Sequence, residues 1–189
     1  ILAPNHVSHL DPPISACAQN RRQLTFMAKE ELFSSKAFGW LIRSLGAFPI
    51  KRGESDMESI RKAVALLEEG RAMLIFPEGA RGNGKELGKF NAGPAMLAKR
   101  TGAKIVPVGI VGTHIVWPRG QKKLRRHKMT VAYGTPFTYE EVATGPNEKV
   151  NRELFNTALE ERILELCRSN GLDLRTSTES TGQPAPSIQ

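Results

Sequence analysis

Short apolar runs that alternate with segments of helical periodicity are the feature that most limits how this chain can fold. Each run is only four to seven residues long and is bounded by Gly, Pro or charged residues, which is typical of buried strands. The runs are Leu24–Ala28, Ala47–Ile50, Ala72–Phe76, Ile105–Val111 and Met129–Tyr133, and Ile1–Ala3 has the character of the end of a further strand.

Helical segments are predicted between the runs. Ser55 and Glu58 form a capping-box pattern, and apolar residues then recur at helical spacing up to Gly70. Further helices are predicted at Ala95–Arg100 and Glu148–Arg168. Strands that alternate with helices predict an α/β fold, a single domain with a mainly parallel central sheet flanked by helices. In such sheets, ligands bind beyond the carboxyl ends of the strands.

The predicted domain covers residues 1–172. Residues 173–189 are predicted to form a disordered tail, because the sequence from about Thr176 onward is rich in Ser, Thr, Pro and Gly. The chain begins without Met and inside an apolar run, so we expect the domain to be N-terminally incomplete. The missing segment could carry a membrane anchor. Within the chain itself, no apolar run approaches the roughly 18 residues of a membrane span.

Positive charge is concentrated in one zone. The chain has 27 Lys+Arg against 19 Asp+Glu, and ten of these bases but no acid lie between Leu87 and Tyr139. Such a zone favours an anionic partner: a phosphate ligand, an anionic membrane face, an acidic protein or nucleic acid. Nucleic acid is disfavoured, because the zone has no recognisable nucleic-acid-binding motif and Trp117 is the only aromatic residue near the run Lys122–Lys128 before Tyr133. A solvated loop is the alternative interpretation of that run.

The segment that follows the first strand carries a candidate base. A histidine near neutral pH can take a proton from a hydroxyl, and a carboxylate on its other ring nitrogen would fix the tautomer. His6 and Asp11 are separated by about 140° on a helix, so they can meet only across a loop or at the start of a helix. Asp11 before Pro12 is typical of a helix start, and a purely structural helix cap remains the alternative.

A metal site is a second alternative for the same segment. His6, His9 and Asp11 superficially resemble part of a metal-ligand cluster. Such clusters usually need more ligands, and only His114 and His127 remain, the latter inside a basic run. We therefore expect no metal site.

Arg52 is a candidate phosphate-binding residue. It follows the strand Ala47–Ile50 and lies beside Gly53, and its guanidinium could bind a phosphate through two hydrogen bonds. A solvated turn with surface charges is the alternative.

The segment after Ala72–Phe76 combines an acid, a glycine and a second arginine. Gly79 permits a tight turn. Glu78 could hold a substrate hydroxyl or orient Arg52 or Arg81, and Arg81 is the second candidate for binding a phosphate. A strand-end turn with a Glu–Arg pair is the structural alternative.

These side chains are expected to converge, because each of them follows the end of an apolar strand. In a mainly parallel sheet, the carboxyl ends of the strands lie along one edge. That edge would hold a base, its orienting acid and two phosphate-binding arginines. Such a set could move a group onto a hydroxyl of a phosphorylated small molecule.

Four short blocks occur in order along the chain: Asn-His-x4-Asp at residues 5–11, Gly-x-x-x-Ile-x-Arg at 46–52, Phe-Pro-Glu-Gly-x-Arg at 76–81 and Val-Pro-Val-Gly-Ile at 106–110. Together they resemble the lysophosphatidic acid/glycerol-3-phosphate acyltransferase family, and the match covers roughly Pro4–Gly134. The chain departs from the family at Ala80 and Gly82, where Thr and Ser are usual. Both changes remove a hydroxyl near the expected phosphate.

The resemblance implies an enzyme that moves a fatty acyl group from acyl-CoA or acyl-carrier protein to the free hydroxyl of a lysophospholipid. The most direct acceptor is 1-acyl-sn-glycerol 3-phosphate, which would give phosphatidic acid. No metal or redox cofactor is implied. The residues to which the resemblance assigns roles are His6 as general base, Asp11 as its orienting acid, and Arg52, Glu78, Gly79 and Arg81 as substrate-binding residues.

The resemblance also implies a protein at the cytoplasmic face of a membrane, peripheral or anchored by a segment that this sequence does not include. The basic zone would then dock on an anionic membrane surface or on an acyl-carrier protein. Two alternatives stay open: an acyltransferase for glycerol 3-phosphate or another lysolipid, and a non-catalytic module that binds anionic membranes. Only the enzyme needs His6 and Asp11 in contact.

Overall fold

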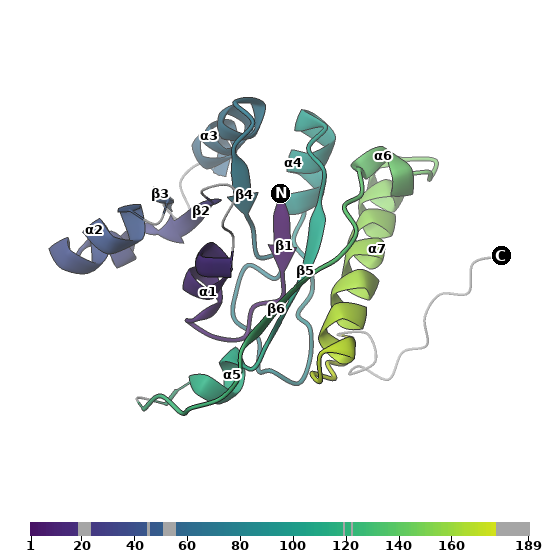
Figure 1. Cartoon of the computed structure of the whole chain (residues 1–189). Coiled ribbons are helices and arrows are strands. Elements are labelled where there is room, and N and C mark those ends of the chain that lie inside the picture. The colour runs from purple at the N-terminus through teal and green to yellow at the C-terminus, as the bar shows by residue number, and fades with distance from the viewer. Residues whose placement is uncertain (19–23, 45, 51–55, 119, 122, 177–189) are drawn as a thin grey trace.

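The computed structural model describes residues 1–18, 24–44, 46–50, 56–118, 120–121 and 123–176. Figure 1 shows a central sheet with helices on both sides. The strands are β1 (Leu2–Pro4), β2 (Leu24–Lys29), β3 (Ala47–Ile50), β4 (Ala72–Leu74), β5 (Val106–Val111) and β6 (Thr130–Tyr133). The helices are α1 (Asp11–Ala18), α2 (Lys36–Ser44), α3 (Asp56–Glu68), α4 (Gly93–Thr101), α5 (Thr113–Val116), α6 (Tyr139–Val142) and α7 (Glu148–Ser169), with a 3-10 helix η1 at Glu30–Phe33.

The strands form one sheet in the order β3-β2-β4-β1-β5-β6. All neighbouring pairs are parallel except β5 with β6. In the centre, Leu2 of β1 pairs with Leu74 of β4 and with Val106 of β5. The predicted α/β fold with a mainly parallel sheet is therefore confirmed, and each predicted strand is found within two residues of its expected bounds.

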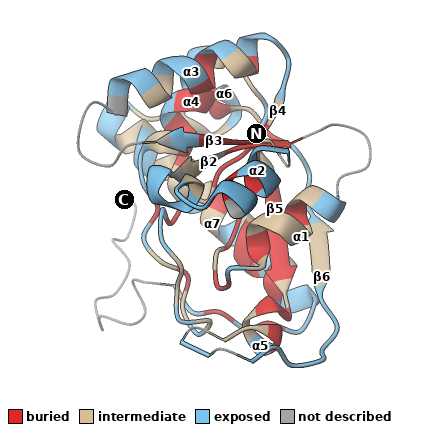
Figure 2. Ribbon diagram, turned by 90° about the vertical axis from the view of Figure 1, so that its left-hand side faces the viewer, coloured by how far each residue is buried: buried red, intermediate tan, exposed pale blue. Residues whose placement is uncertain are grey.

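Alternation of side chains along the central strands divides the core into two layers. Ala3 and Met73 lie in a buried cluster with residues of α3, α4 and α7. Their neighbours Leu2 and Leu74 lie in a second cluster, which Ile42 of α2 covers on the other face. Figure 2 shows the buried residues gathered on the sheet and on the parts of the helices that face it. The sheet is thus covered on both faces, as a parallel sheet requires.

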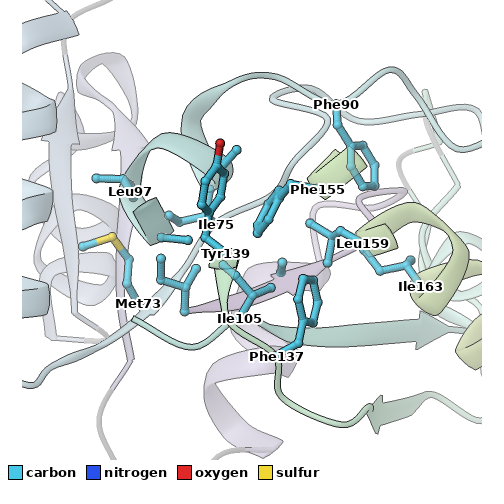
Figure 3. Packing of buried hydrophobic residues seen from close by; sticks show 14 of the residues in the cluster. Met73, Ile75, Phe90, Leu97, Ile105, Phe137, Tyr139, Phe155, Leu159 and Ile163 are labelled. Atoms are coloured by element: carbon cyan, nitrogen blue, oxygen red, sulfur yellow. The ribbon is translucent and has the colours of Figure 1, made fainter. Parts of the chain in front are cut away.

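The larger cluster is built around α7 (Figure 3). The ring of Phe155 lies 5.6 Å from that of Phe137 and 5.5 Å from that of Tyr139, measured between centroids. Leu159 and Ile163 continue the same buried face of the helix. The long amphipathic helix predicted at residues 148–168 is thereby confirmed. It packs against β5.

The end of the described chain differs from the predicted tail. Leu174 is buried, the N–H of Leu87 donates to the carbonyl of Arg175, and the N–H of Arg175 donates to that of Lys85. The first residues assigned to the tail therefore pack on the domain, whereas residues 177–189 lie outside the described residues. Ser55 of the predicted capping box also lies outside them. Within the described ranges, no helix has both the length and the apolar character to cross a bilayer.

Candidate active site

His6 and Asp11 meet just beyond the carboxyl end of β1, where α1 begins. The Nδ1 atom of His6 lies 2.8 Å from the Oδ2 atom of Asp11. The Asp11 side chain is fully buried, whereas 16% of the His6 side chain stays exposed. The contact expected from the sequence is present, and it joins a covered acid to an imidazole that a substrate can reach.

Three nitrogens converge on the same Asp11 oxygen. Besides the His6 ring, the backbone N–H groups of Val7 and Ser8 donate to Oδ2 at 2.6 and 2.7 Å. The carboxylate thus accepts hydrogen bonds from the loop that precedes it. A side chain that only capped the helix would instead accept from N–H groups of the first helical turn. Because an ionised carboxylate only accepts hydrogen bonds, the ring nitrogen that faces it must donate. This arrangement leaves Nε2 of His6 as the atom that can take a proton.

Phe76 supports the His6 ring from a second side. The two rings are stacked, with centroids 4.0 Å apart and planes inclined by 25°. Phe76 belongs to the segment that follows β4, next to β1 in the sheet. Two neighbouring strand ends therefore set the orientation of one imidazole.

Glu78 ties the loop that carries His6 to the loop that follows β4. Its Oε1 atom accepts the backbone N–H of His6 at 2.7 Å, and its Oε2 atom accepts that of Gly88 at 2.8 Å. The residue is only 9% exposed. The geometry shows a carboxylate that holds backbone, while the substrate contact expected for Glu78 from the sequence stays a prediction.

Burial raises the pKa of Glu78 to about 7. The hydrogen bonds from Gly88 and His6 act in the opposite direction, and the charges of Asp11 and Glu160 raise the pKa further. Desolvation is the largest of these effects, since it penalises the ionised form of an acid with little access to water. Glu78 therefore changes its charge near neutral pH, and it is bonded to the backbone N–H of the candidate base, His6.

Backbone hydrogen bonds hold the loop after Glu78 in place beside His6. The N–H of Gly82 donates to the carbonyl of His6 at 2.8 Å, and the N–H of Asn91 donates to that of Pro77 at 2.9 Å. Gly79 adopts φ of +65°, and a Cβ there would collide with the Asn91 side chain. Only glycine fits this turn without strain, as the sequence led us to expect.

Of the two candidate phosphate-binding arginines, only Arg81 lies among the described residues. Arg81 is half-buried, and the pKa of His9 is lowered by burial and then by the charges of Arg81 and His6. Arg81 therefore lies on the same side of the molecule as His6. Arg52 lies outside the described residues, so its place at this edge stays a prediction.

His9 lies against Trp117, with ring centroids 5.5 Å apart. In the part of the chain that the structure describes, no three His, Cys, Asp or Glu side chains are grouped so that they could hold a metal ion.

Asn5 has a structural role that the sequence reasoning did not identify. Its Oδ1 atom accepts the backbone N–H of Ile110 at 2.7 Å, and its Nδ2 atom donates to the Ile110 carbonyl at 3.0 Å. The side chain is fully buried and continues the pairing of β1 with β5 beyond Pro4. It links the first sequence block to the fourth, for which no role had been assigned. A lone amide directly after an apolar strand is the signal that could have indicated it.

The chain is similar to known acyltransferases. A family model described as "Acyltransferase" matches residues 1–111. A 1-acyl-sn-glycerol-3-phosphate acyltransferase of Streptococcus pneumoniae (strain ATCC BAA-255 / R6) is 33% identical over 159 residues, 83% of this chain and 55% of that protein. One of Bacillus subtilis (strain 168) is 32% identical over 151 residues, 80% of this chain and 71% of that protein. A lyso-ornithine lipid O-acyltransferase of Pseudomonas aeruginosa is 36% identical over 107 residues, 56% of this chain and 40% of that protein.

The fold has a solved counterpart. The crystal structure of the 1-acyl-sn-glycerophosphate (LPA) acyltransferase, PlsC, from Thermotoga maritima superposes with a TM-score of 0.70 at 24% identity. The likeness covers 98% of this chain and 67% of that one. The chain thus spans only part of its relatives, about half of the Streptococcus pneumoniae protein.

Proposed function

Because the chain belongs to the acyltransferase family, we propose that it transfers a fatty acyl group from a thioester to the free hydroxyl of a lysophospholipid. The observation that carries the proposal is the contact between His6 and Asp11 at the edge of the sheet. The names of the relatives favour 1-acyl-sn-glycerol 3-phosphate as the acceptor and phosphatidic acid as the product. The donor is acyl-CoA or acyl-carrier protein.

The transfer needs one base and no redox step. Nε2 of His6 takes the proton of the acceptor hydroxyl as its oxygen forms a bond to the thioester carbonyl carbon. The carbon–sulfur bond then breaks, and the thiolate leaves with the bonding electrons and receives the proton from the imidazolium. Asp11 stabilises the imidazolium while it exists. This scheme forms no acyl-enzyme and uses no cofactor besides the donor.

The acceptor phosphate requires cations at the same edge. We assign Arg81 and Arg52 to this task, and Gly79 to the turn that brings Arg81 there. The charge of Arg81 lowers the pKa of His9, three residues from His6, and this supports its assignment. Glu78 holds the backbone of the loop that carries the base, since its oxygens accept two backbone N–H groups.

A membrane supplies the acceptor and takes up the product, so we place the protein at the cytoplasmic face of a membrane. The basic zone suits an anionic leaflet or an acidic acyl-carrier protein as partner. Co-sedimentation with anionic vesicles should weaken as salt rises, and binding that salt does not affect would contradict this placement.

Another lysolipid is the second candidate acceptor. It is favoured by the similarity to a lyso-ornithine lipid acyltransferase and by Ala80 and Gly82, which supply no hydroxyl beside the expected phosphate. A non-catalytic membrane-binding module is disfavoured, because it would have no need for the His6–Asp11 contact.

The test is thiol release from acyl-CoA by the full-length protein with a panel of acceptors. The panel contains 1-acyl-sn-glycerol 3-phosphate, glycerol 3-phosphate and lyso-ornithine lipid. We expect the first to give the highest kcat/KM. A preference for lyso-ornithine lipid, which has no phosphate, would overturn the assigned acceptor, and no thiol release with any acceptor would overturn the enzyme.

A further inference from the structure

The connection between β5 and β6, residues 112–129, carries an unusual surface, which we call the basic excursion. Figure 1 shows it extending from the domain beyond α5. Its sequence contains no acid, and its exposed cations among the described residues are Lys123, Arg125, Arg126 and Lys128. Exposed apolar side chains lie among them, with Ile115 37%, Leu124 63% and Met129 36% exposed.

The basic excursion touches the loop between His6 and Asp11 through Trp117. The Ser8 hydroxyl donates to the Trp117 carbonyl at 3.0 Å. The His9 ring lies against the Trp117 ring at 5.5 Å. Ser8 also donates its backbone N–H to the Asp11 carboxylate, so Trp117 is one contact away from the residue that orients the base.

Trp117 is joined equally to the cationic part of the excursion. Its indole Nε1–H donates to the Gln121 carbonyl at 2.7 Å. The N–H of Arg125 donates to the carbonyl of Val116, the residue before Trp117, at 2.8 Å. A continuous path of contacts therefore leads from the exposed cations to the loop that holds Asp11.

We propose that the basic excursion docks on an anionic lipid bilayer and that Trp117 transmits this docking to the loop between His6 and Asp11. The inference rests on the proposed acyltransferase function and adds where the lipid binds and how binding reaches the base. Each Lys or Arg beside an anionic leaflet strengthens binding about fivefold, so the four cations together would contribute several hundredfold.

A bilayer fits this surface better than an acidic protein does. Of the nine large apolar side chains that are exposed among the described residues, six lie in the connections that follow β2 and β5. They include Trp40 and Leu41 of α2 and Leu124 of the basic excursion. Both connections leave the carboxyl edge of the sheet, where His6 lies. Exposed apolar groups in two connections at that edge, cations among them, match a broad lipid surface.

The test compares the full-length protein with three variants on vesicles of phosphatidylcholine, with and without phosphatidylglycerol. The quadruple variant K123Q/R125Q/R126Q/K128Q removes the four exposed cations named above from the basic excursion. Trp117→Leu keeps apolar bulk but removes the ring contact with His9 and the bond to Gln121. Met57→Ala is the control for loss of an exposed apolar side chain, since Met57 is 52% exposed on α3, outside both connections. Turnover is followed as thiol release with short-chain substrates that dissolve in water.

We expect the wild type to sediment with anionic vesicles and its turnover to rise about fivefold, a typical coupling between two sites. The quadruple variant should lose the preference for anionic over pure phosphatidylcholine vesicles. Trp117→Leu should still sediment and keep its turnover without vesicles, but lose the rise, and Met57→Ala should retain the rise. Amide hydrogen exchange across residues 5–11 should slow on vesicles in the wild type and not in Trp117→Leu, which gives a readout that needs no turnover.

Three results would overturn the inference: a quadruple variant that keeps the wild-type preference for anionic vesicles, a wild type that sediments with unchanged hydrogen exchange across residues 5–11, or Trp117→Leu that responds to vesicles as the wild type does. Failure to sediment, together with binding to an acyl-carrier protein, would assign the surface to that carrier instead. Turnover that vesicles leave unchanged contradicts this inference alone, whereas a wild type without thiol release contradicts the proposed function.

Discussion

Nδ1 of His6 lies 2.8 Å from Oδ2 of Asp11, and the same oxygen accepts the backbone N–H groups of Val7 and Ser8. The loop between the two residues is thereby closed on the acid that orients the imidazole. The local backbone and the ring share one anchor, so a change at Asp11 should alter the direction of the base as well as its electrostatic environment.

Asp11→Asn should lower kcat by about 10² to 10⁴-fold and change KM for the acceptor much less. An amide provides no negative charge for the imidazolium and can present an N–H₂ group to donors that need an acceptor. Steady-state thiol release measures both constants. Asp173→Asn is the matched control, because Asp173 is exposed and its ion pair with Arg168 lies at the surface. A variant with the kcat of the wild type would remove Asp11 from the assigned role.

Phe76→Ala should lower kcat roughly tenfold, about the value of a stacked aromatic pair, with little change in the acceptor KM. The His6 ring would lose the neighbour that covers one of its faces at 4.0 Å. Phe76→Tyr keeps the ring and should retain most of the activity. If both variants behave alike, ring stacking does not orient the base.

Glu78 should make the free energy of unfolding depend on pH. Its pKa is raised in the folded chain to about 7, so the folded state holds this proton more tightly than the unfolded state does. The stability contributed by the protonated group is complete below the unfolded pKa and is lost as pH rises through about 7. Between about pH 5 and about pH 8 the wild type should lose up to about 3 kcal/mol relative to Glu78→Gln, which does not titrate. Urea unfolding of both proteins across this range measures the difference, and parallel pH profiles would contradict it.

Asn5→Ala should destabilise the fold by about 2 to 4 kcal/mol. The change leaves the buried N–H and carbonyl groups of Ile110 without the Asn5 amide as partner. Asn5→Asp keeps an acceptor for the Ile110 N–H but loses the donor to the Ile110 carbonyl. We therefore expect this variant to fold with reduced stability as well. Urea unfolding tests both, with Asn170→Ala as a control for loss of an exposed amide, which donates to the nearby Leu166 carbonyl at the end of α7. Equal stability of Asn5→Ala and the wild type would show that β1 and β5 need no such link.

The strands and the meeting of His6 with Asp11 could be predicted because both depend on short stretches of sequence. Apolar runs bounded by Gly, Pro or charged residues define strands, and parallel pairing then brings their carboxyl ends to one edge. The spacing of five residues and Pro12 allowed a contact at a helix start, and the family resemblance predicted it.

The supports of the site could not be predicted, because they join distant residues. Glu78 bonds to the backbone of His6 across 72 positions, and Asn5 bonds to Ile110 across 105. Both contacts depend on the register of the folded sheet, which no local pattern shows.

Helix α2 was missed for a different physical reason. Gly39 lies in its middle and weakens helix propensity, yet a Cβ there would approach the Phe33 carbonyl oxygen to 2.8 Å. The apolar residues of the helix are also only partly buried: Ile42 lies in the second cluster, whereas Trp40 and Leu41 are exposed. In the folded chain the helix packs against η1 and β3.

The most direct test of the account is the turnover of His6→Ala in the full-length protein, measured as thiol release with 1-acyl-sn-glycerol 3-phosphate. Circular dichroism and thermal unfolding establish that the variant is folded. If His6 is the general base, kcat falls by about 10² to 10⁴-fold while the fold is retained. A folded variant with turnover near that of the wild type would contradict the account.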